Sequence, residues 1–409
     1  MGRRMWSPRV IVTERGVVEA DPGTPGWWQR LERAVGEAAL LARLTVSLTG
    51  HLLRAPSYRW LWMLVRLLAF STLLLPGFFR MVVWYFTSKR VMRNVAYSPK
   101  PRNLLDVYSP ESLRRTDPAA RRPVLVFVTG GAWIIGYKAW GALLCRRLSK
   151  QGMVVVSLDY RNFPQGTVGD MVDDVELGME WVYRNVHLYG GDRERIYLVG
   201  QSAGAHISAL ALMRRAFGAP GVARVSPQAS KLVGQNSSFE ISWRPETVRA
   251  FVGVSGAYNL RKLEDHVTER GLSKNIFNII MSKDGQPELE VFSPALVVGD
   301  APFAPNGSTA PAAQSLPPFL LIHGTADQSI PYAHAVDFAQ RLRASGVQVE
   351  LKLLNGETHT TPFIENPMKG DDKLTEILLR LALGRSPADI DMCMVPHFLA
   401  RAATLISPF

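Results

Sequence analysis

Short apolar runs alternate with amphipathic segments along most of the chain after about residue 104. Six of the runs are short and continuous enough to be strands buried on both faces of a sheet: 124–128, 154–158, 195–199, 250–254, 319–323 and 347–353. Apolar residues within 172–186 recur every three or four positions, which predicts a crossover helix, and 331–345 predicts another. The alternation predicts an α/β fold with a mostly parallel, doubly wound sheet.

Two stretches interrupt this alternation, near 218–248 and 261–315, and both are heavy in Ser, Pro and Gly. Long insertions of this kind in an α/β fold are typical of a cap or lid over a functional site. We therefore expect a catalytic domain over 94–409 with cap insertions at these two places.

The first part of the chain follows a different pattern. Residues 1–27 are polar and rich in Pro and Gly, which predicts a disordered tail, and 28–93 is predicted to be a membrane-associated helical region. Within it, 60–86 is mostly Trp, Leu, Met, Val and Phe, and exceeds the ~20 residues that cross a bilayer as a helix. Aromatic residues at both of its ends are typical of a membrane interface.

Three residues inside this transmembrane candidate leave its arrangement open. Arg66 and Arg80 would have to reach toward lipid headgroups in a single span, and Pro76 favours a kink. A re-entrant hairpin, a helix lying in the membrane plane and a helix buried against the soluble domain are the alternatives.

Charge is distributed unevenly along the chain, whose formal net charge is +12. Between Glu37 and Asp106 there is no acidic residue but there are ten Lys or Arg, in the same segment as the apolar stretch. Basic residues beside apolar runs favour a lipid bilayer over nucleic acid as the partner. Cys145 and Cys393 are too few to indicate a disulfide framework or a zinc site, so no metal is expected.

The strongest chemical signal is Gly200-Gln201-Ser202-Ala203-Gly204, which follows the strand 195–199 and precedes a helical run over 205–217. A G-x-S-x-G sequence between a strand and a helix is the nucleophile elbow, in which the serine hydroxyl projects above the carboxyl edge of the sheet. Ser202 is therefore the predicted nucleophile, and a simple structural turn is the alternative.

A serine hydroxyl needs a base and an orienting acid, expected in the chain order Ser, acid, His. Asp327 and His359 each follow a predicted strand, so both should lie at the carboxyl edge. Glu357 is a rival acid, but it is too near His359 in sequence to reach the far imidazole nitrogen, and we expect it to be a solvated loop charge. The other histidines lack this setting or are expected to be structural.

An oxyanion formed at Ser202 would need backbone N–H donors from a glycine-rich loop and from the residue after the nucleophile. The loop Thr129-Gly130-Gly131-Ala132-Trp133 follows the first buried strand. We expect Gly131, Ala132 and Ala203 to be the donors, with Gly130 and Gln201 beside them. Trp133 and Tyr160 are candidates for an apolar pocket, with a place in the core as the alternative. No cofactor is expected, since hydroxyl, imidazole and carboxylate suffice for acyl transfer.

With these residues placed, the chain resembles the hormone-sensitive-lipase-like carboxylesterases of the α/β-hydrolase fold, whose loop motif is His-Gly-Gly-Gly-Trp. Thr129 and Ala132 replace the histidine and the third glycine, a version similar to that of the plant isoprenylcysteine methylesterases. The resemblance covers about residue 85 to the C-terminus. Four longer strings carry it: 130–140, 159–166, 197–206 and 406–409.

The resemblance implies a serine carboxylesterase that removes the methyl ester from a C-terminal prenylated cysteine at endoplasmic reticulum and Golgi membranes. Its substrates would be prenylated, carboxyl-methylated proteins or prenylcysteine methyl esters, with the choice between farnesyl and geranylgeranyl left open. A broader carboxylesterase, an arylformamidase-like amidohydrolase and a catalytically inactive membrane-bound binding module are the alternatives.

The basic residues after the apolar stretch predict a catalytic domain in the cytosol. Two glycosylation sequons, 236–238 and 306–308, argue for the lumen, and we expect neither to be modified.

Overall fold

The structure is a computed structural model. The structure describes residues 9–13, 16–20, 58–100, 102–110, 121–219, 226–234, 240–270, 274–299, 314–387 and 393–409. Most of the predicted N-terminal tail, residues 28–57 and both sequons lie outside these residues.

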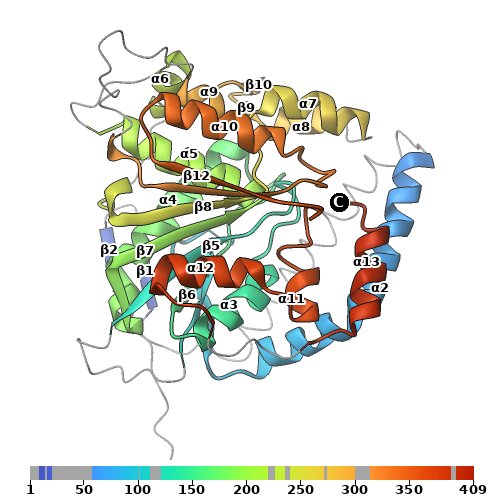
Figure 1. Ribbon diagram of the computed structural model, residues 1–409. Coiled ribbons are helices and arrows are strands. Elements are labelled where there is room, and N and C mark those ends of the chain that lie inside the picture. Colours follow the sequence, from blue (N-terminus) through green and yellow to red (C-terminus); the bar gives the residue numbers. More distant parts are fainter. Residues whose placement is uncertain are drawn as a thin grey trace, which may run out of the picture.

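An eight-stranded sheet forms the centre of the molecule (Figure 1). The strands in spatial order are β12 (Val349–Leu354), β11 (Phe319–Gly324), β8 (Val248–Val254), β7 (Gly191–Gln201), β5 (Arg122–Val128), β6 (Val154–Leu158), β4 (Leu104–Tyr108) and β3 (Val91–Ala96). The pairs from β12 to β6 are parallel, and β4 and β3 are antiparallel to their neighbours. The predicted mostly parallel sheet is confirmed, and its parallel strands end at one common edge.

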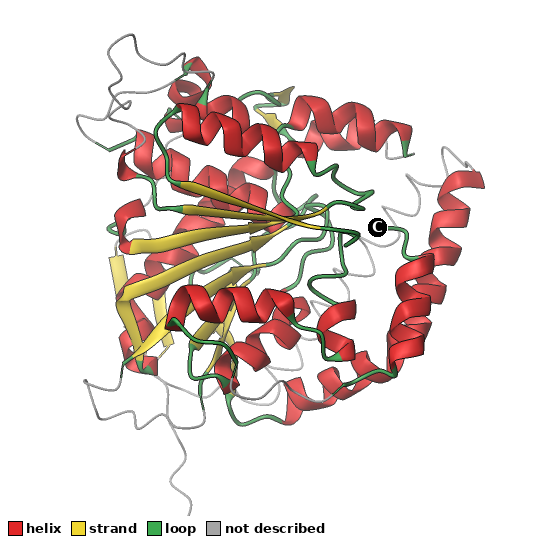
Figure 2. Ribbon diagram, in the orientation of Figure 1, coloured by secondary structure: helices red, strands yellow, loops and turns green. Residues whose placement is uncertain are grey.

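Helices cover both faces of the sheet (Figure 2). The first face carries α4 (Val168–Asn185), α5 (Ala203–Phe217), α6 (Pro227–Val233), α7 (Leu260–Glu269), α8 (Lys274–Ile280), α9 (Pro294–Val298) and α10 (Ala333–Ala344). The second carries α2 (Tyr58–Thr87), α3 (Ala142–Lys150), α11 (Glu365–Lys369), α12 (Lys373–Leu383) and α13 (His397–Ile406). Each face of the sheet buries its own apolar cluster, as expected for strands without a polar face.

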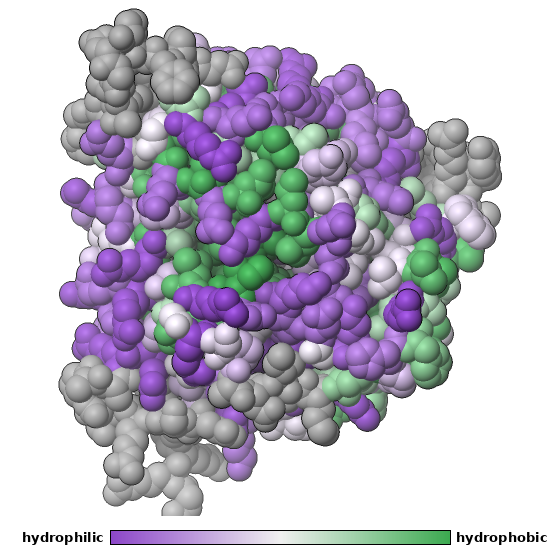
Figure 3. Space-filling view, viewed as in Figure 1, coloured by the Kyte–Doolittle hydropathy of each residue, from purple (hydrophilic) through white to green (hydrophobic). Residues whose placement is uncertain are grey.

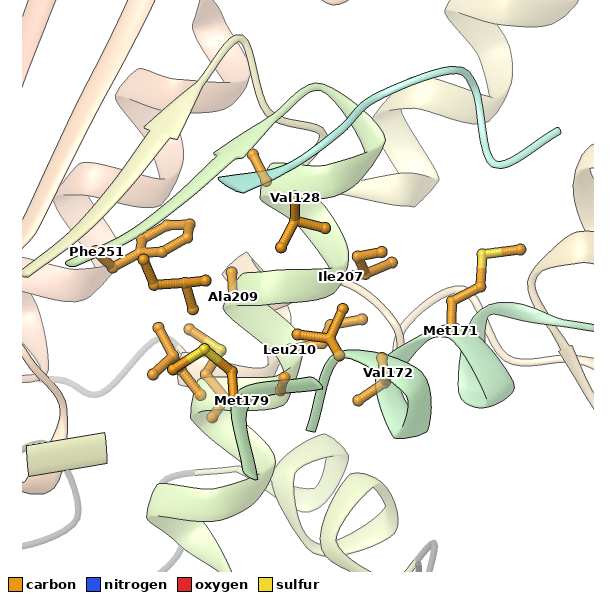
Figure 4. Close-up of a cluster of buried hydrophobic side chains, with 14 of the residues drawn as sticks. Val128, Met171, Val172, Met179, Ile207, Ala209, Leu210 and Phe251 are labelled. Carbon is orange, nitrogen blue, oxygen red and sulfur yellow. The ribbon is translucent and has the colours of Figure 1, made fainter. Parts of the chain in front are cut away.

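The core under the nucleophile elbow is built where α4 and α5 pack against the sheet (Figure 4). Met171, Val172 and Met179 of α4 and Ile207 and Leu210 of α5 are all buried there. Gly178 lets α4 approach β6, because a Cβ at this position would lie 1.9 Å from Leu158 Cδ1. This packing holds the start of α5 firmly beneath the carboxyl edge of the sheet.

Two strands extend the sheet further toward the N-terminus than the sequence predicts. β3 and β4 contain alternating or mixed side chains, which carry a weaker signal than a continuous apolar run. Because β3 begins at Val91, the catalytic sheet starts inside the segment assigned to the membrane-associated region. A separate hairpin of β1 (Arg9–Thr13) and β2 (Gly16–Ala20) lies within the segment expected to be disordered.

The apolar stretch forms the single helix α2, close to its predicted bounds. From Trp62 to Thr87 the helix is long and apolar enough to cross a membrane. It bends partway along its length, as expected with Pro76 inside it, and lies side by side with α13 (Figure 2). Both helices lie on the side of the molecule toward which the carboxyl ends of the strands point (Figure 1).

The two predicted cap insertions differ in what they contact. The described residues of the first bind α4 and α9: Trp243 Nε1 donates to Glu176 O at 3.0 Å and Ser226 Oγ to Val297 O at 2.6 Å. The second contains β9 (Ser282–Lys283) and β10 (Gln286–Pro287) besides α7 to α9. It is this second insertion that reaches the residues of the candidate site.

Candidate active site

Ser202 lies in the sharp turn between β7, which ends at Gln201, and α5, which begins at Ala203. Its backbone has φ 54° and ψ −121°, a conformation that L-residues rarely adopt and that is typical of strained functional turns. The neighbouring glycines are required by space, because a Cβ on Gly204 would lie 2.1 Å from Val128 O. The G-x-S-x-G sequence thus forms a tight elbow that lifts the serine above the sheet.

Ser202, His359 and Asp327 form one hydrogen-bonded chain. The Ser202 Oγ lies 2.9 Å from His359 Nε2, and His359 Nδ1 lies 2.7 Å from Asp327 Oδ2. All three residues are buried, so little water competes for these hydrogen bonds. The geometry suits proton transfer from the hydroxyl to the imidazole, with the carboxylate holding the ring and its tautomer.

Asp327 is held by backbone as well as side-chain donors. Its Oδ1 accepts hydrogen bonds from the N–H of Ser329 and of Ile330, both at 2.9 Å. Burial would raise the pKa of this carboxyl, but the neighbouring His359 and His323 and the hydrogen bonds outweigh it, so the pKa lies well below its usual range. The carboxylate form of Asp327 is therefore favoured, and it can stabilise an imidazolium.

His323 is a second histidine against the same carboxylate. Its Nε2 lies 3.1 Å from Asp327 Oδ2 and 2.8 Å from Ile330 O, so this nitrogen carries the proton. The sequence indicated only that His323 precedes the acid loop at the end of β11. Its position four residues before Asp327 at a strand end is the signal that would have suggested the contact.

The glycine-rich loop after β5 lies directly against the nucleophile. A Cβ on Gly130 would be 2.8 Å from Ser202 Cβ and 2.2 Å from Gln201 Oε1. Gly131, Ala132 and Trp133 have φ of 123°, 49° and 62°, so three successive residues are left-handed. Successive backbone amides in such conformations form a concave anion-binding surface.

The N-terminus of α5 contributes to the same place. Ala203 is its first residue, and the N–H groups of a first helical turn have no partner within the helix. The helix dipole also favours negative charge at this end. Ala203 follows Ser202 directly and the loop at Gly130 lies against Ser202, so the N–H groups of Ala203, Gly131 and Ala132 remain the predicted oxyanion donors.

A buried ionic network fixes the far end of this loop. Arg102 Nη2 donates to Gly136 O at 2.6 Å and to Asp159 Oδ1 at 2.9 Å, while Asn162 Nδ2 donates to the same Gly136 O at 2.7 Å. Burial raises the pKa of Asp159 to about 7, although Arg102 and Lys138 oppose this. The guanidinium of Arg102, itself paired with Asp159, and the amide of Asn162 therefore hold the same loop carbonyl.

Trp133 and Tyr160 are buried residues that hold the glycine-rich loop after β5 in place through hydrogen bonds. Tyr160 is fully buried and its hydroxyl donates to Thr129 O at 3.0 Å. Trp133 Nε1 donates to His206 Nδ1 at 3.1 Å, and its ring meets Phe277 of α8 edge to face. Both residues occupy the core, because their polar atoms have partners there, and neither is open to solvent as an exposed pocket wall would be.

His206 does not compete for the role of base. Its Nδ1 accepts from Trp133 and its Nε2 lies 2.6 Å from Phe292 O, so both nitrogens are occupied. Burial lowers its pKa to about 4. This neutral histidine instead ties α5 to the oxyanion loop and to the second cap insertion.

Two glutamates hold the loop that carries His359. Glu357 was expected to be a solvated loop charge, but its side chain is 12% exposed and accepts from Asn366 Nδ2 at 2.9 Å. Glu365, which the sequence did not suggest, accepts from Thr360 Oγ1 at 2.9 Å. Its burial and the nearby Glu357 raise the pKa of Glu365 to about 7. The prediction for Glu357 was wrong because a charge near a strand end was taken to face solvent.

Comparison with known proteins places the chain among esterases. The family model BD-FAE matches residues 105–342. The chain is 42% identical over 394 residues to a probable isoprenylcysteine alpha-carbonyl methylesterase of Oryza sativa subsp. japonica, covering 93% of this chain and 85% of the relative. It is 41% identical over 392 residues to an isoprenylcysteine alpha-carbonyl methylesterase of Arabidopsis thaliana, with the same coverage. The resemblance noted from the sequence is confirmed.

More distant matches agree on the fold. Esterase LipC of Mycobacterium tuberculosis is 34% identical over 283 residues, covering 68% of this chain and 62% of that protein. Among solved structures, an inhibited esterase B from Lactobacillus rhamnosis matches with a TM-score of 0.53 at 20% identity, covering 73% of this chain and 89% of the other. The predicted α/β-hydrolase fold is confirmed.

Proposed function

Because this chain belongs to the isoprenylcysteine alpha-carbonyl methylesterase family, we propose that it hydrolyses the methyl ester of a C-terminal prenylated cysteine through an acyl-enzyme on Ser202. The observation that carries the chemistry is the continuous hydrogen bonding from Ser202 through His359 to Asp327. The names of the relatives support the choice of substrate, since the same three residues serve many acyl groups.

In the first half of the proposed reaction, Ser202 Oγ attacks the ester carbonyl carbon and His359 Nε2 takes its proton. The carbonyl oxygen becomes an oxyanion, which the N–H groups of Gly131, Ala132 and Ala203 stabilise. Collapse of this intermediate breaks the bond to the methoxy group, and His359 returns the proton so that methanol leaves. Ser202 then carries the prenylcysteine as an ester.

In the second half, His359 removes a proton from a water molecule, which attacks the same carbonyl carbon. The second oxyanion collapses, His359 gives its proton to Ser202 Oγ, and the prenylcysteine leaves as a carboxylic acid, which releases the other proton of the water molecule to solvent. Asp327 remains ionised throughout, because its low pKa prevents it from accepting the imidazole proton. His359 therefore carries the transferred proton in both halves of the proposed reaction.

The membranes of the endoplasmic reticulum and Golgi are the proposed location, with the catalytic domain on the cytosolic side. Prenyl chains partition into bilayers, so an enzyme held at the membrane meets its substrate at a high local concentration. The apolar helix α2 supports membrane association. The cytosolic side would leave the sequons at 236–238 and 306–308 unmodified, so endoglycosidase treatment should not change the mobility of the protein.

Covalent labelling tests the proposed nucleophile. A fluorophosphonate probe should label the folded protein and fail to label Ser202→Ala, because the probe reacts with an activated serine. The matched control is Ser208→Ala on α5, which also removes a buried hydroxyl close to the elbow and should keep labelling. Unlabelled wild-type protein would mean a catalytically inactive fold used for binding.

The substrate is tested by comparing kcat/KM for a prenylcysteine methyl ester with that for short p-nitrophenyl esters and for N-formylkynurenine. We expect the prenylated substrate to be preferred. Equal or better turnover of the short esters would indicate a broad carboxylesterase, and preference for N-formylkynurenine an amidohydrolase.

A further inference from the structure

Helices α2 and α13 expose apolar side chains in numbers unusual for a surface in water. Along α2 these side chains recur every three or four residues except between Leu68 and Leu75, where Thr72 takes the position, so they lie along one side of the helix. Two more project from α13, and apolar residues gather along this edge of the molecule, with hydrophilic residues among them (Figure 3). The side chains, named here the docking face, are Trp62, Val65, Leu68, Leu75, Phe79, Val82, Val83, Phe86, Phe398 and Leu405.

The opposite side of α2 is packed against the catalytic domain along its length. Phe70, Leu74, Met81 and Tyr85 are buried in the apolar cluster of the second sheet face. Gly77 allows the closest approach, because a Cβ there would lie 2.6 Å from Val395 Cγ2 and 2.9 Å from Met368 Sδ. The helix is therefore a fixed part of the domain rather than a tether leaving it.

Arg66 and Arg80 of α2 are bound to the C-terminal segment. Arg66 donates to Ile406 O at 3.0 Å and to Ser407 O at 2.5 Å, and Arg80 donates to Met394 O at 3.4 Å. In a helix crossing a bilayer, these guanidinium groups would have to leave their carbonyls or carry the C-terminal segment into the hydrocarbon. Either is costly, because backbone groups have no other partner there.

Charge around the docking face suits an anionic lipid surface. Neither α2 nor α13 contains an acidic residue. Lys89 is exposed just after α2, Arg93 is partly exposed in β3, and Arg401 is exposed on α13. Basic residues at the border of an apolar surface are attracted to anionic headgroups.

The docking face adjoins the active site through a chain of hydrogen bonds. Arg66 of α2 binds Ser407 O, and Arg270, just after α7, donates to Pro408 O at 2.6 Å. Arg270 also donates to the carbonyl of Gln328, the residue after Asp327. The rim of the site and α2 are thus joined through the C-terminal segment.

We propose that α2 and α13 together form a docking face that lies in the plane of an anionic bilayer, with α2 not crossing it. The role of this docking face rests on the proposed function, because docking would bring the active site beside the membrane in which a prenyl chain resides. Ester hydrolysis and membrane docking are nevertheless separate properties, and they are measured separately below.

Binding is tested with the full chain and vesicles of phosphatidylcholine with about one-third phosphatidylserine. Replacing exposed apolar side chains by charges, in Phe79→Glu with Val82→Glu, should weaken vesicle binding about tenfold or more. Leu188→Glu is the matched control, since Leu188 is also about half exposed, at 49%, but lies outside both helices. All variants should hydrolyse a short soluble ester like the wild type, which also reports correct folding.

The orientation is tested with nitroxide labels on Trp62→Cys, Leu75→Cys and Phe86→Cys, each in a C393S background. Cys145 is fully buried and would not react. An in-plane helix predicts that all three labels have similar, shallow depths in the vesicles. A spanning helix predicts that the central label is the deepest, and that result would overturn the proposal.

Two further outcomes also count against the docking face. Equal vesicle binding by the charged variant and the wild type would exclude it. Self-association that the same substitutions abolish, without vesicle binding by the wild type, would assign the face to a second copy of the chain. Poor turnover of prenylcysteine esters with intact vesicle binding would instead refute the proposed substrate and leave the docking face standing.

Discussion

The carboxyl edge of the sheet buries polar groups, whereas the α2–α13 surface exposes apolar ones. At the edge, the polar atoms of Ser202, His359 and Asp327 are buried and hydrogen-bonded. On the α2–α13 surface, apolar side chains such as Phe79 are exposed, and the guanidinium of Arg66 donates hydrogen bonds to backbone carbonyls. The first region shields its polar groups from water, whereas the second exposes apolar groups, which suits contact with a non-aqueous partner such as the proposed bilayer.

This contrast indicates that reactivity and location are specified by separate parts of one rigid domain. Catalysis depends on a few polar contacts with specific distances, so single-atom changes there should alter the rate with little effect on stability. Docking depends on area and charge, so it should respond to the sum of several side chains. The following substitutions test this separation.

The largest effect is expected for Asp327→Asn. An amide in place of the carboxylate favours the wrong tautomer of His359 and cannot stabilise its charged form, so kcat should fall by about 10⁴-fold. Vesicle binding should not change. Asp284→Asn, at an exposed position, is the control and should retain full activity. Loss of vesicle binding in Asp327→Asn would contradict the separation between the two regions.

His323 is expected to be a positioning residue for Asp327. His323→Leu removes the donor 3.1 Å from Asp327 Oδ2 and should lower kcat about 10- to 100-fold, with a smaller effect on KM. His323→Gln can place an N–H near the original Nε2 and should recover most of the rate. The pH profile of kcat, measured for both, distinguishes this role from simple packing, because only loss of support for Asp327 should move it. Identical rates and profiles for the Leu and Gln variants would contradict the role.

Gly77→Val tests whether α2 is fixed to the domain. The added side chain would collide with Val395 and Met368, so the free energy of unfolding should fall by about 1–3 kcal/mol. Thr72→Val changes a side chain on the exposed side of the same helix and should change stability by less than about 0.5 kcal/mol. Chemical denaturation measures both. Equal stability of the two variants would mean that α2 is not packed as described.

The smallest effect concerns the pH dependence of stability at Glu365. Its folded pKa of about 7 exceeds the unfolded value, so between these values the folded state holds a proton that the unfolded state has lost, and stability declines as pH rises. Glu365→Gln removes this decline. Thermal unfolding should show little difference between variant and wild type near pH 4.5, and a gain of about 1–2 kcal/mol for the variant above pH 7. If the stability difference between Glu365→Gln and the wild type does not increase with pH, ionisation of Glu365 does not destabilise the folded protein.

The class of fold and the positions of the reacting groups could be predicted from the amino-acid sequence alone. Continuous apolar runs predict buried parallel strands, and such strands end at one edge, so Ser202, Asp327 and His359 could be assigned to that edge from their places after three runs. The strands β3 and β4 escaped prediction because their side chains do not follow a continuous apolar pattern.

The tertiary structure was needed to establish which groups support the reacting residues and how α2 is arranged. His323 and Glu365 act through contacts across loops, and Trp133 and Tyr160 are buried by neighbours from other segments, which local sequence does not encode. For α2, composition allowed a span, a hairpin or an in-plane helix. The packing at Gly77 and the hydrogen bonds of Arg66 and Arg80 distinguish these arrangements. They involve residues far away along the chain, as in the contact of Arg66 with Ile406, so the local sequence does not encode them.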